Sequence, residues 1–129
     1  MVQETVDLQH QQPAYLCGQL LAIIEEAQHR ASRGRVTATL TDRFYGAVSS
    51  APASAFTPLL RLAKTAHLPK LRKQQYVVHQ EIDRLITEVM VKLDRSGGFP
   101  RLLPLRDQAL FALGYYQQRA AFQSRGAVQ

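Results

Sequence analysis

The sequence predicts an all-α protein, a single helical bundle of four main helices plus one short helix. Apolar residues recur at spacings of three and four in four segments, prolines and glycines separate these segments, and no segment alternates with period two long enough to form a reliable strand. The chain has 129 residues, 46% hydrophobic and 20% charged, which is typical of one globular domain. We expect a flexible N-terminal segment over 1–12, the bundle domain over 13–123 and a frayed C-terminus over 124–129.

The first long helix is expected to begin at Pro13, because the N–H that proline lacks is not needed in a first helical turn. Gly34 is expected to stop it. Its apolar stripe consists of Leu16, Leu20, Ile24, Ala27 and Ala31. A short helix is predicted over 42–48, with Thr39 or Thr41 as its cap.

Pro52 is expected to open the second long helix and Pro69 to end it. The third long helix is predicted over 70–93, with Glu81–Arg84 and Glu88–Lys92 pairs on its outer face. The last helix is predicted from Pro104. Its apolar side carries Leu105, Ala109, Ala112, Leu113, Tyr116 and Ala120.

Candidate catalytic and metal-binding residues are isolated from one another. No two of the four histidines lie three or four residues apart, Ser50 and Ser54 lack a nucleophile pattern, and no Lys-Ser or Lys-Thr follows Gly97-Gly98. The single cysteine, Cys17, lies beside an apolar stripe and is expected to pack in the core. We therefore expect no catalytic residue, no metal and no cofactor. With no apolar run long enough to span a bilayer, we expect a cytoplasmic protein that contacts no membrane.

The net charge of +6 is concentrated in one part of the chain. Residues 30–73 carry nine Lys or Arg against Asp42 alone, a balance of +8, whereas residues 1–29 carry −4 and residues 74–129 carry +2. A positive field of this kind attracts a polyanion, and 12 of the 16 cations are arginines, which bind phosphate with a planar fork of donors. Nucleic acid is the functional interpretation. A solvated face and an acidic protein partner are the alternatives.

The residues predicted to line a positive groove share a position in or near this basic stretch. They are Arg33, Arg35, Arg43, Arg61, Lys64, Lys70, Arg72 and Lys73. Arg101, Arg106 and Arg119 are weaker candidates, and periodicity does not place any of these residues on one face. The aromatic residues are expected to pack in the core, with Tyr45 as the exception because it adjoins Arg43. A helix-turn-helix reader fits poorly, since small residues and Pro52 stand where base-reading side chains are needed.

Two runs resemble the C-terminal region of the large subunit of type I-C CRISPR surveillance (Cascade) complexes. The first is TDRFYGAVSSAPASAF over 41–56, continuing as LLRL over 59–62. The second is FPRLL over 99–103, followed by QALFALGYYQQR over 108–119. The stretch 14–18 falls in the expected order, so the resemblance covers about 13–123. In this family the isolated C-terminal part is similar to the separately made small subunit, and the length of the chain suggests that subunit.

The resemblance implies a helical bundle without nuclease activity that assembles along the belly of the complex. The implied partners are the backbone and large subunits, further copies of the chain, the guide RNA–target DNA hybrid and the displaced DNA strand. Combined with the basic stretch, it predicts a non-catalytic small subunit that stabilises the opened DNA strands (the R-loop) through sequence-independent contacts. The alternatives are a stand-alone helical nucleic-acid-binding regulator and a protein-interaction adaptor without nucleic-acid contact.

Overall fold

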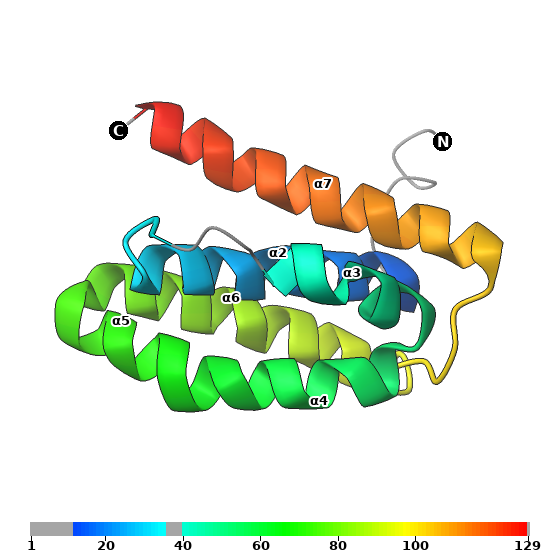
Figure 1. Cartoon of the computed structure of the whole chain (residues 1–129). Coiled ribbons are helices and arrows are strands. Elements are labelled where there is room, and N and C mark those ends of the chain that lie inside the picture. The colour runs from blue at the N-terminus through cyan, green and yellow to red at the C-terminus, as the bar shows by residue number, and fades with distance from the viewer. Residues whose placement is uncertain (1–11, 36–39, 129) are drawn as a thin grey trace.

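The computed structural model describes residues 12–35 and 40–128, with side chains described over 12–35 and 41–124. Helices dominate these residues and no strand occurs among them, so the predicted all-α fold is confirmed. The elements in chain order are α2 (Pro13–Ala31), α3 (Leu40–Ser50), α4 (Pro52–Leu62), the π-helical segment η1 (Ala63–His67), α5 (Leu68–Gln74), α6 (Tyr76–Arg95) and α7 (Leu105–Val128) (Figure 1).

Helix α2 is the centre of the bundle. It packs against α7 on one side and against α5 and α6 on the other, with α3 beside it (Figure 1). The predicted apolar stripe of α2 is buried, and so are neighbours outside that stripe such as Cys17, Leu21 and Ile23. A helix that is apolar nearly all round has to be covered nearly all round. The remaining helices can therefore bury one face each and keep their charged faces in water.

Two glycines set the distance between α2 and α7. A Cβ atom added at Gly18 would overlap the Phe111 carbonyl oxygen, and one added at Gly114 would overlap the Tyr15 carbonyl oxygen. The two backbones therefore touch directly where the helices cross. The Tyr115 hydroxyl donates to the Glu25 carboxylate at 2.9 Å and so adds a polar link between the same two helices.

The outward face of α7 differs from the prediction. Phe111, Gly114 and Tyr115 are buried against α2, whereas most of the apolar side predicted for this helix lies at the surface. This surface is called the α7 row below and consists of Leu105, Ala109, Leu113, Tyr116 and Ala120. The face of α7 that carries Phe111, Gly114 and Tyr115 is the one buried against α2, because glycine permits close backbone contact and the two aromatic rings bury a large apolar area there.

The predicted helix boundary at Pro69 is wrong. The chain stays helical through Pro69 to Gln74, and the break comes at Gln75, where φ is −146° and ψ is 77°. In a regular helix the proline ring would meet the carbonyl group four residues earlier. Here the preceding turn is widened, with the Leu68 N–H bonded to the Ala63 carbonyl five residues back. The wider turn accommodates the ring, so α4, η1 and α5 follow one another without a loop.

The first residues of the short helix also differ from the prediction. Thr41 is the second residue of α3 rather than its cap, and Thr39 lies outside the described residues. On α6, Arg84 contacts both Glu81 at 3.2 Å and Glu88 at 2.7 Å, so Glu88 pairs with Arg84 and not with the expected Lys92.

The aromatic residues mostly pack in the core, as expected, but Tyr45 is not the exception. Its ring lies edge-on to Phe111 at 5.3 Å and to Tyr115 at 5.7 Å between centroids. The exposed aromatic residues are instead Tyr76 and Tyr116. Of the predicted domain boundaries, the segment 1–11 lies outside the described residues and α7 runs on to Val128, so a flexible start and a frayed end stay predictions.

Replacing either glycine at the crossing should destabilise the protein strongly. The Gly18→Ala and Gly114→Ala variants place a methyl group against backbone atoms that cannot rotate away, so the helices must separate. We expect the free energy of unfolding to fall by about 1–3 kcal/mol or more, measured by urea denaturation.

Gly46→Ala in α3 is the matched control, since no atom lies within 4 Å of its added Cβ. It should leave stability unchanged or raise it by up to about 1 kcal/mol, because alanine is the better helix former. Equal effects at all three positions would contradict the close crossing.

Cys17 should be chemically inert in the folded protein. Burial raises the pKa of its thiol from the ordinary 9.0 to about 12, and the thiolate is the reactive form. A thiol reagent at pH 8 should therefore react only as fast as the chain unfolds, and at once in denaturant. The raised pKa also makes stability depend on pH. Its contribution to the free energy of unfolding is fully present below pH 9.0 and is lost as the pH rises toward about 12. Fast labelling of the native chain would contradict the packing role.

Candidate nucleic-acid interface

Three of the predicted basic residues meet beside α5. Lys64, Arg72 and Lys73 line one depression of about 650 Å³, which also contains His79 from α6. Leu68 and Pro69 also line it. Lys64, Leu68 and Arg72 follow one another at four-residue spacing, so they form a row along one side of the helix. This hollow is called the α5 depression below.

Three further candidates gather on the other side of α5. Arg33 and Arg35 follow α2, and with Lys70 they line a second hollow of about 310 Å³. Arg33 has a φ of 57°, a left-handed conformation that glycine adopts more easily. It stands where the turn after α2 is closed by the Gly34 N–H bonding to the His29 carbonyl at 2.9 Å. An arginine thus occupies a position that the backbone alone would assign to glycine.

The two hollows flank the exposed side of α5. Because a helix turns 100° per residue, Arg72, Lys73 and Lys70 spread across that side, and the buried Leu71 faces α2. The structure therefore joins six of the eight candidates around α5. This set is called the basic surface below and consists of Arg33, Arg35, Lys64, Lys70, Arg72 and Lys73.

The two remaining candidates lie outside these hollows. Arg61 is exposed on α4, three residues before Lys64. Arg43 is exposed on α3, with its guanidinium 5.8 Å from the centre of the Phe44 ring. Among the weaker candidates, Arg119 donates to the Tyr115 hydroxyl at 3.3 Å. Arg101 and Arg106 are exposed near the start of α7 and line neither hollow.

The basic surface has few carboxylates nearby. No Asp or Glu occurs between residues 61 and 80, a stretch that contains five Lys or Arg. Over the described parts of the chain, the ion pairs use Arg30, Arg84 and Arg106, and none uses a member of the basic surface. Unneutralised like charges repel one another and create a field that concentrates anions. The arrangement is therefore suited to contact with the phosphates of a nucleic acid.

His67 lies in η1, within the sequence of the basic stretch. Burial lowers the pKa of its imidazole, and the positive charge of Lys70 lowers it further. The side chain is therefore neutral at physiological pH and adds no charge to the basic surface.

An aromatic pair at the start of α6 was not found from the sequence. Tyr76 stacks on His79, with ring centroids 6.0 Å apart and planes at 25°. Nδ1 of His79 lies 3.1 Å from the Leu68 carbonyl oxygen, which fixes the imidazole at the edge of the α5 depression. Sequence reasoning missed the pair because it placed the break at Pro69, which put Tyr76 in mid-helix. A signal was available, because Tyr76 lies only three residues after the basic stretch, which ends at Lys73.

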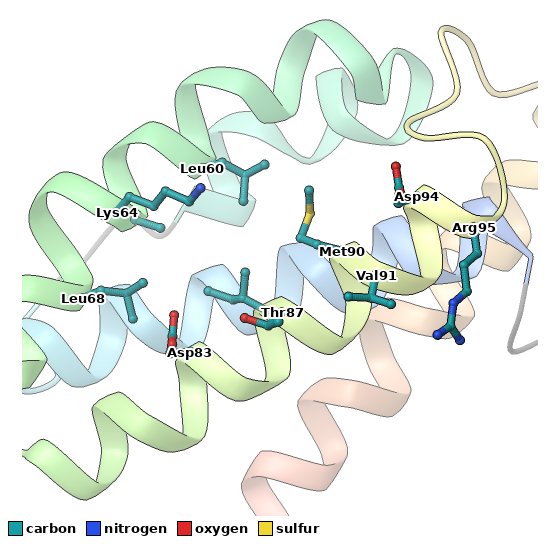
Figure 2. Close-up of a pocket in the computed structure, with 11 residues that line it drawn as sticks. Leu60, Lys64, Leu68, Asp83, Thr87, Met90, Val91, Asp94 and Arg95 are labelled. Carbon is teal, nitrogen blue, oxygen red and sulfur yellow. The ribbon is translucent and has the colours of Figure 1, made fainter.

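A second, mainly apolar groove adjoins the α5 depression and limits the basic surface. It lies between α4–η1 and α6, has a volume of about 460 Å³, and shares Lys64 and Leu68 with the depression (Figure 2). Figure 2 shows Asp83 and Asp94 on the α6 side, with Met90 pointing across toward Leu60. Asp83 and Asp94 are balanced in this groove by Lys64 and Arg95, so the groove does not extend the excess positive charge of the basic surface.

Within residues 12–35 and 40–128, no three His, Cys, Asp or Glu side chains are grouped so that they could hold a metal ion. None of the helices described is both long enough and apolar enough to cross a bilayer.

Comparison with known families decides the relationship of the chain. A family model of a CRISPR-associated protein (Cas_Csd1) matches residues 1–123. The chain belongs to the Cas_Csd1 family. The match spans both runs of residues that resemble type I-C Cascade subunits, and it confirms the CRISPR association expected from them. No curated protein matches the chain. In this Cas_Csd1 chain the basic surface is thus a feature of a CRISPR-associated helical bundle.

Removing four cations on and beside the α5 depression should weaken binding to single-stranded and partly opened DNA. In the variant Arg61, Lys64, Arg72 and Lys73 are all replaced by Ala. If two to four of them contact phosphates, the slope of log affinity against log salt should flatten by about 0.7 per contact for a single strand. The loss should be nearly the same for every sequence, because phosphates carry no base identity. Fluorescence anisotropy at several salt concentrations measures both effects.

A matched variant removes the same charge from the opposite end of the bundle. It replaces Lys92, Arg95, Arg101 and Arg106 by Ala, and all four are exposed. This variant should keep the salt slope, and both variants should keep a helical circular dichroism spectrum. An unchanged slope in the first variant and a flattened slope in the second would move the interface away from α5.

Proposed function

We propose that this Cas_Csd1 protein is a non-catalytic small subunit of a type I-C Cascade complex that stabilises opened target DNA through its basic surface. The observation that carries the proposal is the gathering of six cations around α5 with no carboxylate between residues 61 and 80. The family supports a role in a CRISPR complex. The basic surface supports contact between the chain and a polyanion in such a complex.

Stabilising an opened duplex requires contacts that do not depend on sequence. The guide RNA reads the target by base pairing, so a protein that also read bases would restrict the choice of target. Exchanging a DNA duplex for an RNA–DNA hybrid is nearly balanced in free energy, and a few phosphate contacts can tip the balance. Lys and Arg side chains on an exposed helix provide such contacts, and each acts through charge rather than base identity.

A subunit of a larger assembly also needs a surface for protein partners. The α7 row supports this part of the proposal, because Leu105 is 82% exposed and Tyr116 is 59% exposed on the side of α7 that faces away from α2. Apolar rows of this kind are typical of protein contacts. The row and the basic surface lie on different helices, so one chain can contact a protein and a nucleic acid at the same time. We also propose that the chain has no nuclease or other enzymatic activity.

Co-expression with the other type I-C subunits and a guide RNA tests the assignment. The chain should co-purify with the assembled complex, and adding target DNA should give an R-loop that closes faster when the four cations near α5 are replaced. Permanganate footprinting of unpaired thymines measures the opened state. A chain that never joins the complex and instead binds one particular duplex sequence would support the stand-alone regulator.

The α7 row provides a second arm of this experiment. Leu105→Asp together with Leu113→Asp should abolish co-purification and leave the helical spectrum and the affinity for free single strands unchanged. If the double variant lost both co-purification and affinity for free single strands, the α7 row and the basic surface would not be separate surfaces. Full co-purification with no change in R-loop lifetime for the four-cation variant would favour the adaptor that contacts no nucleic acid.

A further inference from the structure

Helix α5 is a two-turn segment between two irregular points of the backbone. It has seven residues. Before it lies the widened turn η1, in which the Leu68 N–H bonds to the Ala63 carbonyl five residues back, and Pro69 has no N–H to donate. After it the helical path breaks at Gln75. A helix this short is not stable by itself, so α5 keeps its place only through contacts with the rest of the bundle.

Few contacts hold α5 in place, and repulsion opposes them. Leu68 and Leu71 are its two buried side chains, and Nδ1 of His79 lies 3.1 Å from the Leu68 carbonyl oxygen. Its three cations repel one another, and no Asp or Glu occurs between residues 61 and 80 to reduce that repulsion. A segment with few buried apolar contacts can open locally while the rest of a protein stays folded.

His67 lies in η1, at the point where α5 begins. The imidazole is half-buried, and its Nε2 atom is buried with no hydrogen-bond partner in the described part of the chain. A neutral imidazole can carry its proton on Nδ1, which leaves Nε2 without an N–H. An imidazolium carries a proton on both nitrogens, so protonation creates a buried donor that has no acceptor. The folded turn therefore disfavours the charged form of His67.

The carboxylates near η1 do not compensate this charge. The elements packed against η1 are α2, α4 and α5. On α2, the Glu25 carboxylate accepts a hydrogen bond from the Tyr115 hydroxyl, and Glu26 is paired with Arg30. Asp83 is on α6, on the far wall of the apolar groove that η1 lines. The carboxylates of α2 thus already have partners of their own.

The other charges around η1 are positive. Burial lowers the pKa of His67, and the positive charge of Lys70 lowers it further. Because the pKa in the folded state lies below the ordinary value of 6.5, protonation begins to cost stability as the pH falls below 6.5. Besides the groups already named, the charged or titratable side chains in the second half of α2, in α4, in η1 and in α5 are His29, Arg61, Lys64, Lys70, Arg72 and Lys73.

We propose that η1 is an acid-sensitive hinge, in which protonation of His67 releases α5 from α2 while the crossing of α2 and α7 stays closed. Opening lets the imidazolium reach water, which gives its buried N–H an acceptor and reduces the repulsion from Lys70. The hinge bends where the backbone is already irregular, at the widened turn and at Gln75. The crossing is unaffected, because its contacts lie on the other side of α2.

Release of α5 would break up the basic surface. Lys64 belongs to η1, and Lys70, Arg72 and Lys73 belong to α5, so four of the six members move with the hinge. Arg33 and Arg35 stay with the turn after α2. The hinge thus makes the basic surface depend on pH. Only this consequence rests on the proposed function, whereas the hinge itself is a property of the chain alone.

Amide hydrogen exchange of the full-length chain, without nucleic acid, tests the hinge. Protection factors are compared between about pH 7.5 and about pH 5.5, because they correct for the pH dependence of exchange itself. The amides of α5 and of Gln75, whose N–H bonds to the Leu71 carbonyl at 2.7 Å, should lose protection below pH 6.5. The loss should reach up to about tenfold per pH unit. The amides of Phe111 and Tyr115 should keep their protection.

Substitutions at and near His67 connect the loss to one imidazole. His67→Phe fills a similar volume without a titratable group and should keep the protection of α5 constant over this pH range. His67→Gln, which is neutral throughout, gives the same comparison if the phenylalanine does not fit. His29→Gln is the matched control, since His29 is an exposed imidazole on α2, and it should behave as the parent does. Lys70→Gln should lose less protection than the parent, because one of the two causes is removed.

Three results would overturn the hinge. In the first, the protection of α5 in the parent is the same at both pH values. In the second, the neutral His67 variants lose as much protection as the parent. In the third, Phe111 and Tyr115 lose protection together with α5, which means that the chain unfolds as one unit. None of these results bears on the proposed function, which the salt slope of the four-cation variant tests separately at neutral pH.

Discussion

The direct backbone contact between α2 and α7 is the constraint from which most of the architecture follows. Gly18 and Gly114 let the two helices approach until main-chain atoms touch, and Phe111 and Tyr115 fill the space beside the crossing. Because α7 takes one side of α2, the chain from α4 to α6 has to cover the other side. The same contact fixes the rotation of α7 about its axis, which leaves Leu105, Leu113 and Tyr116 at the surface.

On the opposite side of α2, a continuous helical path and a sharp turn bring the cations together. The widened turn of η1 carries the chain past Pro69, so α5 ends only at Gln74, and α6 folds back after Gln75. This places His79 beside Arg72 and Lys73, with Tyr76 stacked on His79. Grouping like charges without neutralising carboxylates costs stability in the isolated chain. A bound polyanion reduces this repulsion, so the grouping of cations is consistent with the proposed contact with a nucleic acid.

The two surfaces are separated by the bundle itself. The basic surface borders α5, the apolar row lies along α7, and α2 stands between them (Figure 1). The groove between α4 and α6 adds no excess positive charge, because Asp83 and Asp94 balance Lys64 and Arg95 in its lining. This separation supports the proposed function, in which the chain contacts protein on one side and an opened DNA strand on another.

The sequence by itself determined the fold class, the buried stripe of α2 and the concentration of positive charge, because these depend on local spacing and composition. It also carried the family resemblance. It did not determine which face of α7 is buried, since both faces are apolar and the choice depends on how closely Gly114 approaches a helix almost a hundred residues earlier. Nor did it show that Arg33, Arg35 and Lys70 meet, or that Tyr76 rests on His79. The first contact joins the turn after α2 to α5, so only the tertiary structure decides it. The second lies within α6 and depends on that helix starting after the turn at Gln75 rather than at Pro69.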